Sequence, residues 1–467
     1  MDYWQLRRWH RLTGLVAALA LVPLAAMAQS SEIDQLKREI GALRKNDQER
    51  QKRLDTLERE VDRLRIEAEN AAAGAGKKAA LDRAVEEVRP PETAPPSDLW
   101  SRPLAGGKIR LIDVALVVLA VGGTSTATDD EIAGLQAGGH DPNRRGFTLQ
   151  QAELSLTGAV DPYLTGEAHI VYTSGGVELE EAFLTTQSLP HGLQLEAGHF
   201  FTEFGRINPT HPHAWDWIDQ PVINTRLFGP DGLRAAGFRL GWLTPLPWFS
   251  ELHVGAQNAR EGETTVSFIG EEGIGGLPAA DTGARNLGDL LYLARWNNAW
   301  DLTEDTALLF AMSGLHGPNA TGPDGDTWIY GGDFKLRWRP ANNFRGWPFF
   351  LWQSEVMKRD YAPAAGAILR DWGLYTQALY GFRHGWAGGL RWEYAGSRGQ
   401  SVGGRQSEPL RDDRYRLSPL LAWYPTEYSR FRVQYNYDLA QHLEPDDAHS
   451  VWLGAEILYG AHPAHQY

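Results

Sequence analysis

One segment of the chain, residues 201–232, gathers charged side chains of both signs within a short stretch. Where acidic and basic groups face each other across a narrow passage, the field between them sorts solutes by charge. The same groups would have no such effect if they only fastened the segment to its surroundings through ion pairs, and the sequence leaves both interpretations open. The residues concerned are Glu203, Arg206, Asp216, Asp219 and Arg226.

The same segment contains two histidines, His211 and His213, on either side of Pro212. Imidazole nitrogens combined with a carboxylate from Asp216 or Asp219 form a ligand set that zinc accepts. The spacing matches no established zinc signature, and the proline restricts how the two rings can converge. A metal site at His211 and His213 is therefore an alternative interpretation of this segment.

The sequence around this segment, from about residue 108 to about residue 459, alternates between apolar and polar residues with a period of two. Runs of about 9–11 such residues are long enough to cross a bilayer as tilted strands. Their apolar positions are unusually rich in aromatic residues, which favours a membrane barrel over a soluble sandwich. We count sixteen runs, which start near residues 108, 147, 163, 178, 192, 233, 251, 289, 305, 328, 349, 371, 386, 414, 430 and 450.

The connections between these runs alternate in length. Most of those after even-numbered runs are short turns such as 160–162 and 244–247, whereas most of those after odd-numbered runs are long, such as 122–146 and 259–288. Short turns on one side and long loops on the other are the layout of an outer-membrane barrel. Trp and Tyr also cluster beside the short turns, where their rings would lie at the headgroup level.

If the apolar positions face lipid, the charged positions of the strands must face the lumen. Their mixture of signs suits a water-filled, weakly selective pore, although the same residues could line a solvated interior without selecting solutes. These positions are Glu167, Arg239, Asp333, Lys335, Arg337, Arg391 and Glu393.

The N-terminal part of the chain divides into three pieces before the barrel. Residues 1–28 have the basic start, apolar stretch and Ala26-Met27-Ala28 end of a signal peptide. Residues 29–70 carry apolar residues at heptad spacing, which predicts a periplasmic coiled coil. Residues 71–103 are rich in Ala, Gly and Pro and predict a linker, and residues 104–467 form the barrel. The expected fold class is all-β, a 16-stranded transmembrane β-barrel with an N-terminal α-helical coiled coil.

The composition excludes several classes of protein. The 467 residues carry a formal net charge of −14, which argues against a nucleic-acid partner, and the absence of Cys excludes disulfides and cysteine-based zinc sites. No nucleophile stands in a recognisable context, so we expect no enzyme and no cofactor. The barrel is also too short for the larger barrel and plug of a TonB-coupled transporter.

Several motifs in the first half of the barrel resemble the phosphate-selective porin superfamily: Asp161-Pro162-Tyr163, Glu180-Glu181-Ala182-Phe183, Gly198-His199-Phe200 and Phe204-Gly205-Arg206. The resemblance implies a sixteen-stranded trimeric channel in which the connection 201–232 folds inward and narrows the pore. The chain shows no dense ladder of basic residues, so phosphate selectivity is not indicated. The run Asn208–Asp216 more closely resembles uncharacterised outer-membrane proteins labelled as zinc-regulated receptors.

We therefore expect an outer-membrane, porin-like channel for passive diffusion of small polar or ionic solutes. Its partners would be outer-membrane lipids, the solutes and two further copies of the chain in a homotrimer. The alternative is an outer-membrane protein that binds zinc or takes part in metal uptake through its histidine-containing loop.

Overall fold

The computed structural model describes residues 101–460 apart from 105–106, 111, 136, 272, 281–285 and 399–410. The predicted signal peptide, the coiled coil and nearly all of the linker lie outside the described residues. No helix among the described residues is long and apolar enough to cross a membrane.

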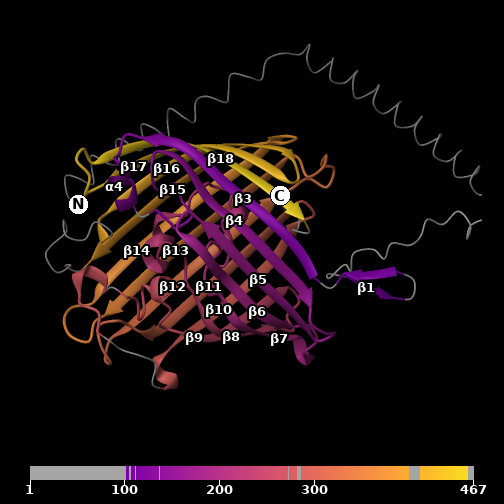
Figure 1. The fold of residues 1–467 in the computed structure, drawn as a ribbon, viewed down its shortest axis with the longest axis horizontal. Helices are drawn as coiled ribbons and strands as arrows, with labels where there is room; N and C mark the ends of the chain where they lie inside the picture. Colours follow the sequence, from indigo (N-terminus) through magenta and orange to yellow (C-terminus); the bar gives the residue numbers. More distant parts are fainter. Residues whose placement is uncertain are drawn as a thin grey trace, which may run out of the picture. The chain divides into compact units, whose positions relative to one another are not determined.

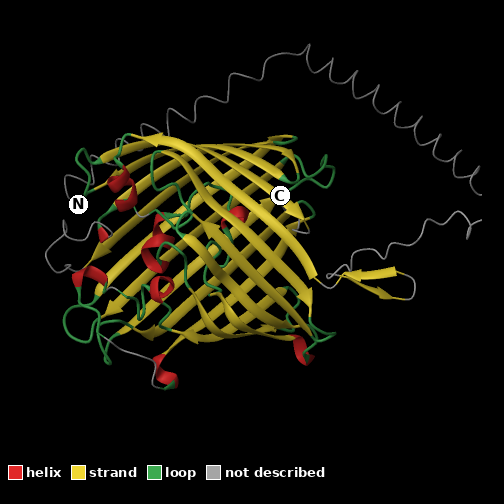
Figure 2. Cartoon of the chain, viewed as in Figure 1, coloured by secondary structure: helices red, strands yellow, loops and turns green. Residues whose placement is uncertain are grey.

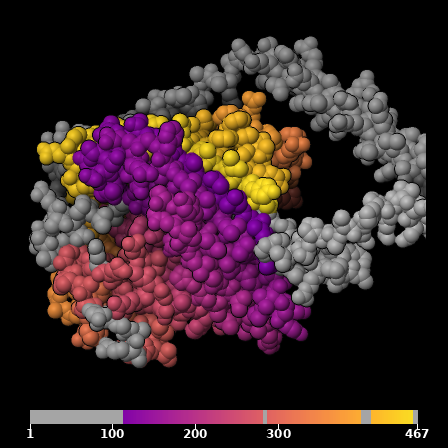
Figure 3. Space-filling model, in the orientation of Figure 1, coloured from indigo at the N-terminus to yellow at the C-terminus, as the bar shows by residue number. Residues whose placement is uncertain are grey.

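Sixteen antiparallel strands form a closed barrel (Figures 1 and 2). They are β3(Ile112–Ser125), β4(Gly146–Ala159), β5(Leu164–Thr173), β6(Gly176–Thr186), β7(Leu193–Phe201), β8(Arg234–Leu243), β9(Phe249–Asn258), β10(Leu290–Thr303), β11(Thr306–Pro318), β12(Asp326–Trp338), β13(Phe349–Ala362), β14(Leu369–Arg383), β15(Trp386–Arg398), β16(Arg414–Thr426), β17(Ser429–Ala440) and β18(Asp447–Gly460). The barrel closes where β18 pairs with β3, and Figure 3 shows these two ends of the colour scale side by side. The predicted sixteen-stranded barrel is thus confirmed.

The remaining elements are short. Strands β1(Ser101–Leu104) and β2(Gly107–Arg110) pair only with each other, so the first barrel strand begins at Ile112 and not near residue 108. In their described parts, the connections contain two α-helices and five 3-10 turns: α4(Asp129–Gly134), α5(Val222–Phe228), η2(Pro190–Gly192), η3(Pro212–Ala214), η4(Gly262–Thr265), η5(Ile274–Gly276) and η6(Leu287–Asp289).

Alternation along each strand separates an outer from an inner face. On β13, Trp352 and Val356 are exposed on the outside, while Gln353, Glu355 and Arg359 are buried inside the barrel. A face of exposed apolar side chains around a polar interior is what a barrel in lipid requires.

The aromatic residues beside the short turns divide between the two faces. Trp242, Trp296 and Trp423 are exposed on the outside, as an aromatic girdle requires. Trp347 and Tyr424, which the sequence places in the same girdle, are instead buried, with ring centroids 5.8 Å apart. They join an inner apolar cluster because Trp217, from another part of the chain, packs there.

The topology predicts which connections reach the outside of a cell that holds the barrel in its outer membrane. The chain has no native Cys, so single cysteines can be introduced as labels. Asp324 lies in the connection between β11 and β12, on the side of the long loops. Glu304 and Glu427 lie in short turns, between β10 and β11 and between β16 and β17. A membrane-impermeant maleimide should label Asp324→Cys on intact cells and should label the other two only after the cells are broken. Labelling of Glu427→Cys on intact cells would contradict this topology.

Candidate functional site: a segment packed inside the barrel

The connection between β7 and β8, residues 202–233, is mostly buried and packs against the inner side chains of the strands. Short helices and loops of this kind are seen within the outline of the barrel in Figure 2. Near its start, the segment passes close to the wall at Gly205. The φ of this residue is 67°, which favours glycine, and a Cβ there would lie only 2.2 Å from a carboxylate oxygen of Glu355 on β13. Two residues further on, Ile207 N donates to the other oxygen of Glu355 at 3.0 Å. The chain therefore turns into the lumen directly after β7.

A buried segment must satisfy its own backbone carbonyls, because water does not reach them. Arginines on the inner face of the wall do this here. Arg430 on β17 donates to His213 O at 2.7 Å, and Arg432 donates to Trp215 O at 3.0 Å and Trp217 O at 2.9 Å. These guanidinium groups keep the segment against the wall.

Two further arginines extend this row of contacts. Arg391 on β15 donates to Asp219 O at 2.8 Å, and Arg359 on β13 donates to Arg226 O at 3.2 Å. The inner wall therefore carries more basic residues than the sequence suggested. Buried arginines do line the inner wall, but they are neutralised by carboxylates or engaged with the segment: Arg359, Arg391, Arg414, Arg416, Arg430 and Arg432.

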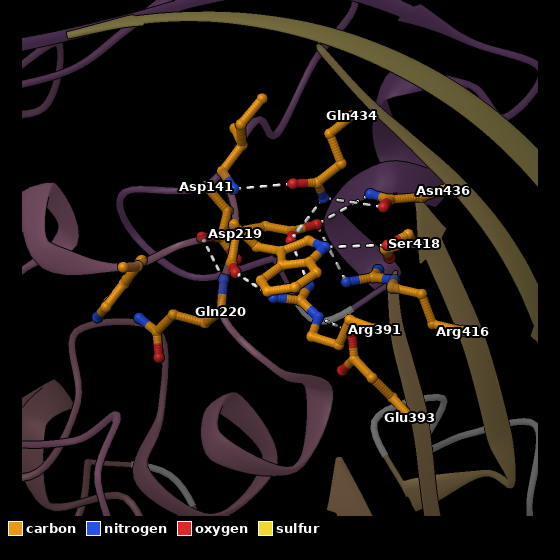
Figure 4. Close-up of polar contacts among 12 residues, drawn as sticks. Asp141, Asp219, Gln220, Arg391, Glu393, Arg416, Ser418, Gln434 and Asn436 are labelled. Atoms are coloured by element: carbon orange, nitrogen blue, oxygen red, sulfur yellow. Dashed lines mark hydrogen bonds and ion pairs between the residues drawn. The ribbon is translucent and has the colours of Figure 1, made fainter. Parts of the chain in front are cut away.

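Asp219 is the most heavily contacted carboxylate of the segment (Figure 4). It forms ion pairs with Arg391 and Arg416, and it accepts hydrogen bonds from Gln434 at 2.7 Å and from Asn436 at 2.9 Å. Burial alone would raise the pKa of Asp219, but the two guanidinium groups lower it below its ordinary value. Asp219 is therefore held as a charged anchor.

A second buried carboxylate, Asp141, lies beside Asp219 and reaches the segment from the loop between β3 and β4 (Figure 4). It accepts from Gly138 N at 2.7 Å and from Gln220 N at 3.0 Å. Burial and the charge of Asp219 raise the pKa of Asp141. Asp141 thus favours the protonated form in the folded protein.

The helix α5 fills the centre of the barrel with apolar side chains. Ile223, Leu227 and Phe228 are almost fully buried and belong to one core cluster with strand residues such as Ile329 and Met357. The long loop between β9 and β10 adds Phe268 and Ile269 to the same core. In the described part of the chain, this part of the lumen is packed like the interior of a soluble protein.

Two cavities flank this core along the barrel. The first has a volume of about 390 Å³ and lies towards the short turns, with Gln353 of β13 in its lining. The second has a volume of about 430 Å³ and lies towards the long loops, with Arg359 of β13 in its lining. Met357 of the core lies between these two positions on β13. The apolar core therefore separates a turn-side cavity from a loop-side cavity.

The turn-side cavity brings together four residues predicted from sequence: Glu203, Arg206, Asp216 and Lys335. Arg206 pairs with Asp333 at 2.7 Å, and Asp333 also pairs with Arg295 at 2.8 Å. This cavity is thus lined by opposed charges, the arrangement that the sequence suggested for a constriction.

The other predicted residues lie elsewhere. Asp219, Arg391 and Glu393 are buried in ion pairs against the packed segment. Arg226 lines the loop-side cavity and lies 3.7 Å from Asp412. Arg239 forms ion pairs with both Glu203 and Glu196. Glu167 lies 3.9 Å from His169. Arg337 is exposed on β12, two positions beyond Lys335 towards the short turns.

His211 and His213 do lie close together, but their carboxylate neighbours are not Asp216 and Asp219. His211 lies 2.7 Å from Glu181 and 3.0 Å from Glu180, and His213 lies 3.0 Å from Glu153. Burial favours neutral imidazole, yet the charges of Glu180 and Glu153 raise the pKa of His211 well above its ordinary value. The glutamates come from strands far away in sequence, so spacing alone could not reveal them.

The pKa of Asp141 gives a test of this packing. Because burial and the charge of Asp219 raise the pKa of this carboxyl to about 7, its contribution to stability is full below the ordinary value of 3.8 and is lost as the pH rises to about 7. Asp141→Asn removes this decline. The apparent Tm of the variant relative to the wild type should therefore increase between pH 4 and pH 8, measured by circular dichroism in detergent. A difference in Tm that is constant with pH would show that Asp141 is charged throughout.

Comparison with known proteins extends this description. No protein-family model matches the chain. Among solved structures, the outer membrane channel DcaP of Acinetobacter baumannii has a TM-score of 0.50 and 11% identity, covering 74% of this chain and 97% of that one. OprB of Pseudomonas putida has a TM-score of 0.48 and 10% identity, covering 74% of this chain and 94% of that one. The likeness to DcaP shows a shared barrel fold.

A sequence relative is more similar. An uncharacterised protein of Aquifex aeolicus strain VF5 is 30% identical over 358 residues, which cover 71% of this chain and 73% of the relative. The chain therefore belongs to the same family as this Aquifex aeolicus protein.

Proposed function

We propose that the protein is an outer-membrane channel through which small polar or ionic solutes diffuse passively, with residues 202–233 as its constriction. The observation that carries the proposal is the turn-side cavity. It lies inside a barrel with an apolar outer face, and opposed charges line it at the point where the segment narrows the lumen. Such a lining acts on the charge of a solute and needs no bound cofactor.

The apolar core around α5 determines how large the passage is. Because Leu227 and Phe228 fill the lumen between the two cavities, we expect a small conductance for each barrel. Solutes that reach the turn-side cavity then meet Arg206 and its partner Asp333. We further propose that the barrel is a homotrimer exported behind the N-terminal signal peptide, which chemical cross-linking and N-terminal sequencing of the mature protein would test.

Planar-bilayer recording of Arg206→Ala tests the constriction. Removal of this guanidinium takes one positive charge from the cavity lining, while the negative charges of Glu203 and Asp216 remain. The preference for cations should therefore increase. The effect should be clear at 0.1 M salt and much weaker at 1 M, because the Debye length falls from about 10 Å to about 3 Å. Reversal potentials in a salt gradient measure this preference.

Arg370→Ala is the matched control for this variant. Arg370 lies on β14, is half exposed and pairs with Asp360 at 3.3 Å, away from the turn-side cavity. Its replacement removes the same charge and should leave ion preference unchanged. Absence of any conductance from the wild-type protein, or equal shifts in the two variants, would contradict the proposed function.

A further inference from the structure

A cluster of histidines and glutamates lies where the first part of the inner segment meets the wall formed by β4, β5 and β6. We name it the His–Glu cluster, and it consists of His169, His211, His213, Glu153, Glu180 and Glu181. The three glutamates are almost fully buried. A buried carboxylate needs a positive partner, because burial without one is costly.

The partners of these glutamates differ from those of the other buried carboxylates. Asp219, Asp371 and Glu456 pair with arginines on the inner wall. In the described part of the chain, the ion pairs of the three cluster glutamates all come from histidines. A site built from imidazole and carboxylate without a guanidinium group has the composition of a metal site.

The wall is locally distorted so that extra polar side chains face this cluster. The pairing of β5 with β6 shifts between His169 and Ile170, which leaves Glu180 as an additional residue on β6. Such a bulge lets Glu180 and Glu181 both point inward, although strict alternation would send one of them to the outside. Bulges of this kind re-aim side chains and are common beside functional sites.

The distances within the cluster match those between ligands of a single small ion. Glu153 Oε2 lies 3.3 Å from His211 Nδ1 and 3.0 Å from His213 Nδ1, and the three atoms lie within 4.8 Å of one another. In a tetrahedral zinc site with bonds of about 2.0–2.2 Å, neighbouring ligand atoms are about 3.3–3.5 Å apart. The two separations from Glu153 Oε2 are thus close to edges of such a tetrahedron, and the third is no more than 4.8 Å.

One further atom lies beside these three without a hydrogen bond. Glu180 Oε2 is buried and lies 3.0 Å from His211 Nδ1, and it makes no hydrogen bond to any of the described residues. An oxygen in this position can accept a hydrogen bond from a water molecule bound to an ion at the site.

We propose that the His–Glu cluster binds one divalent transition-metal ion such as Zn²⁺, with Glu153, His211 and His213 as its protein ligands. Three protein ligands leave one position of a tetrahedron for water, as in other zinc sites of this composition. Glu180, Glu181 and His169 surround the ligands and orient them. The ion ties the start of the inner segment to β4, while the arginines of β15 and β17 hold the rest of it.

The test uses the full-length protein refolded in detergent and stripped with a chelator. Zn²⁺ titrated by isothermal calorimetry should bind with one ion per chain, and Mg²⁺ should not bind. Co²⁺ in place of Zn²⁺ should produce the visible absorption of a four-coordinate site. In His211→Ala/His213→Ala, affinity should fall by more than the about 10–100-fold that loss of a surrounding residue typically costs.

Two more variants make the result decisive. His253→Ala is the control, because His253 is also buried on the inner wall and pairs with a glutamate, Glu251, outside the cluster. Its Zn²⁺ binding should be that of the wild type. Glu153→Gln keeps the volume of the side chain but removes a charged ligand. It therefore tests the site even if the double variant does not fold. Heat-dependent gel mobility shows whether each variant is folded.

Two results would overturn the proposal. If the stripped wild-type protein binds no Zn²⁺ at micromolar concentrations, protons on the imidazoles alone balance the glutamates. If Zn²⁺ binds equally to the wild type and to folded Glu153→Gln, the ion is bound elsewhere. Conductance is not used as a readout, so either result leaves the proposed channel untouched.

Discussion

The structure depends on hydrogen bonds from wall arginines to the backbone carbonyls of residues 213–226. A segment that enters a barrel loses water from its peptide groups, and each buried carbonyl left without a donor would cost about 1–3 kcal/mol. Arg430, Arg432 and Arg391 provide those donors from β17 and β15. The arginines are themselves buried, so they in turn require Glu456, Asp219 and Glu393 as counter-charges.

The other features of the interior follow from this arrangement. With its carbonyls satisfied on one side, the segment can direct Ile223, Leu227 and Phe228 into an apolar core with β10–β14. That core occupies the centre of the lumen, between charged cavities at both of its ends. The segment therefore controls what passes through the barrel. A metal ion bound by His211, His213 and Glu153 would hold the first part of the segment against β4.

The strands could be predicted closely from sequence because alternation and turn residues are local signals. Most observed strands begin within a few residues of the expected positions, such as Phe349, Trp386 and Arg414, where prediction and structure agree. The charged residues of segment 201–232 were also recognisable, since their types and spacing stand out in a single stretch. Their roles were not, because Asp219 and Arg226 are buried in contacts with residues more than a hundred positions away.

Two physical features concealed the rest of the site. The bulge at Glu180 breaks the period of two, so the inward direction of Glu180 cannot be read from alternation. The pairs Arg414 with Arg416 and Arg430 with Arg432 do follow the alternation, but a buried arginine and a solvated one look alike in sequence. Only the position of the inner segment distinguishes a basic pore lining from a set of hydrogen-bond donors.

Single-channel recording of Arg430→Ala/Arg432→Ala tests most directly whether this segment controls the lumen. The variant loses the donors to His213, Trp215 and Trp217, so the segment should leave the wall and the core around α5 should loosen. We expect small conductance steps from the wild-type barrel and clearly larger steps from the variant. Equal step sizes from two folded barrels would contradict this expectation, because they would show that the segment does not limit passage.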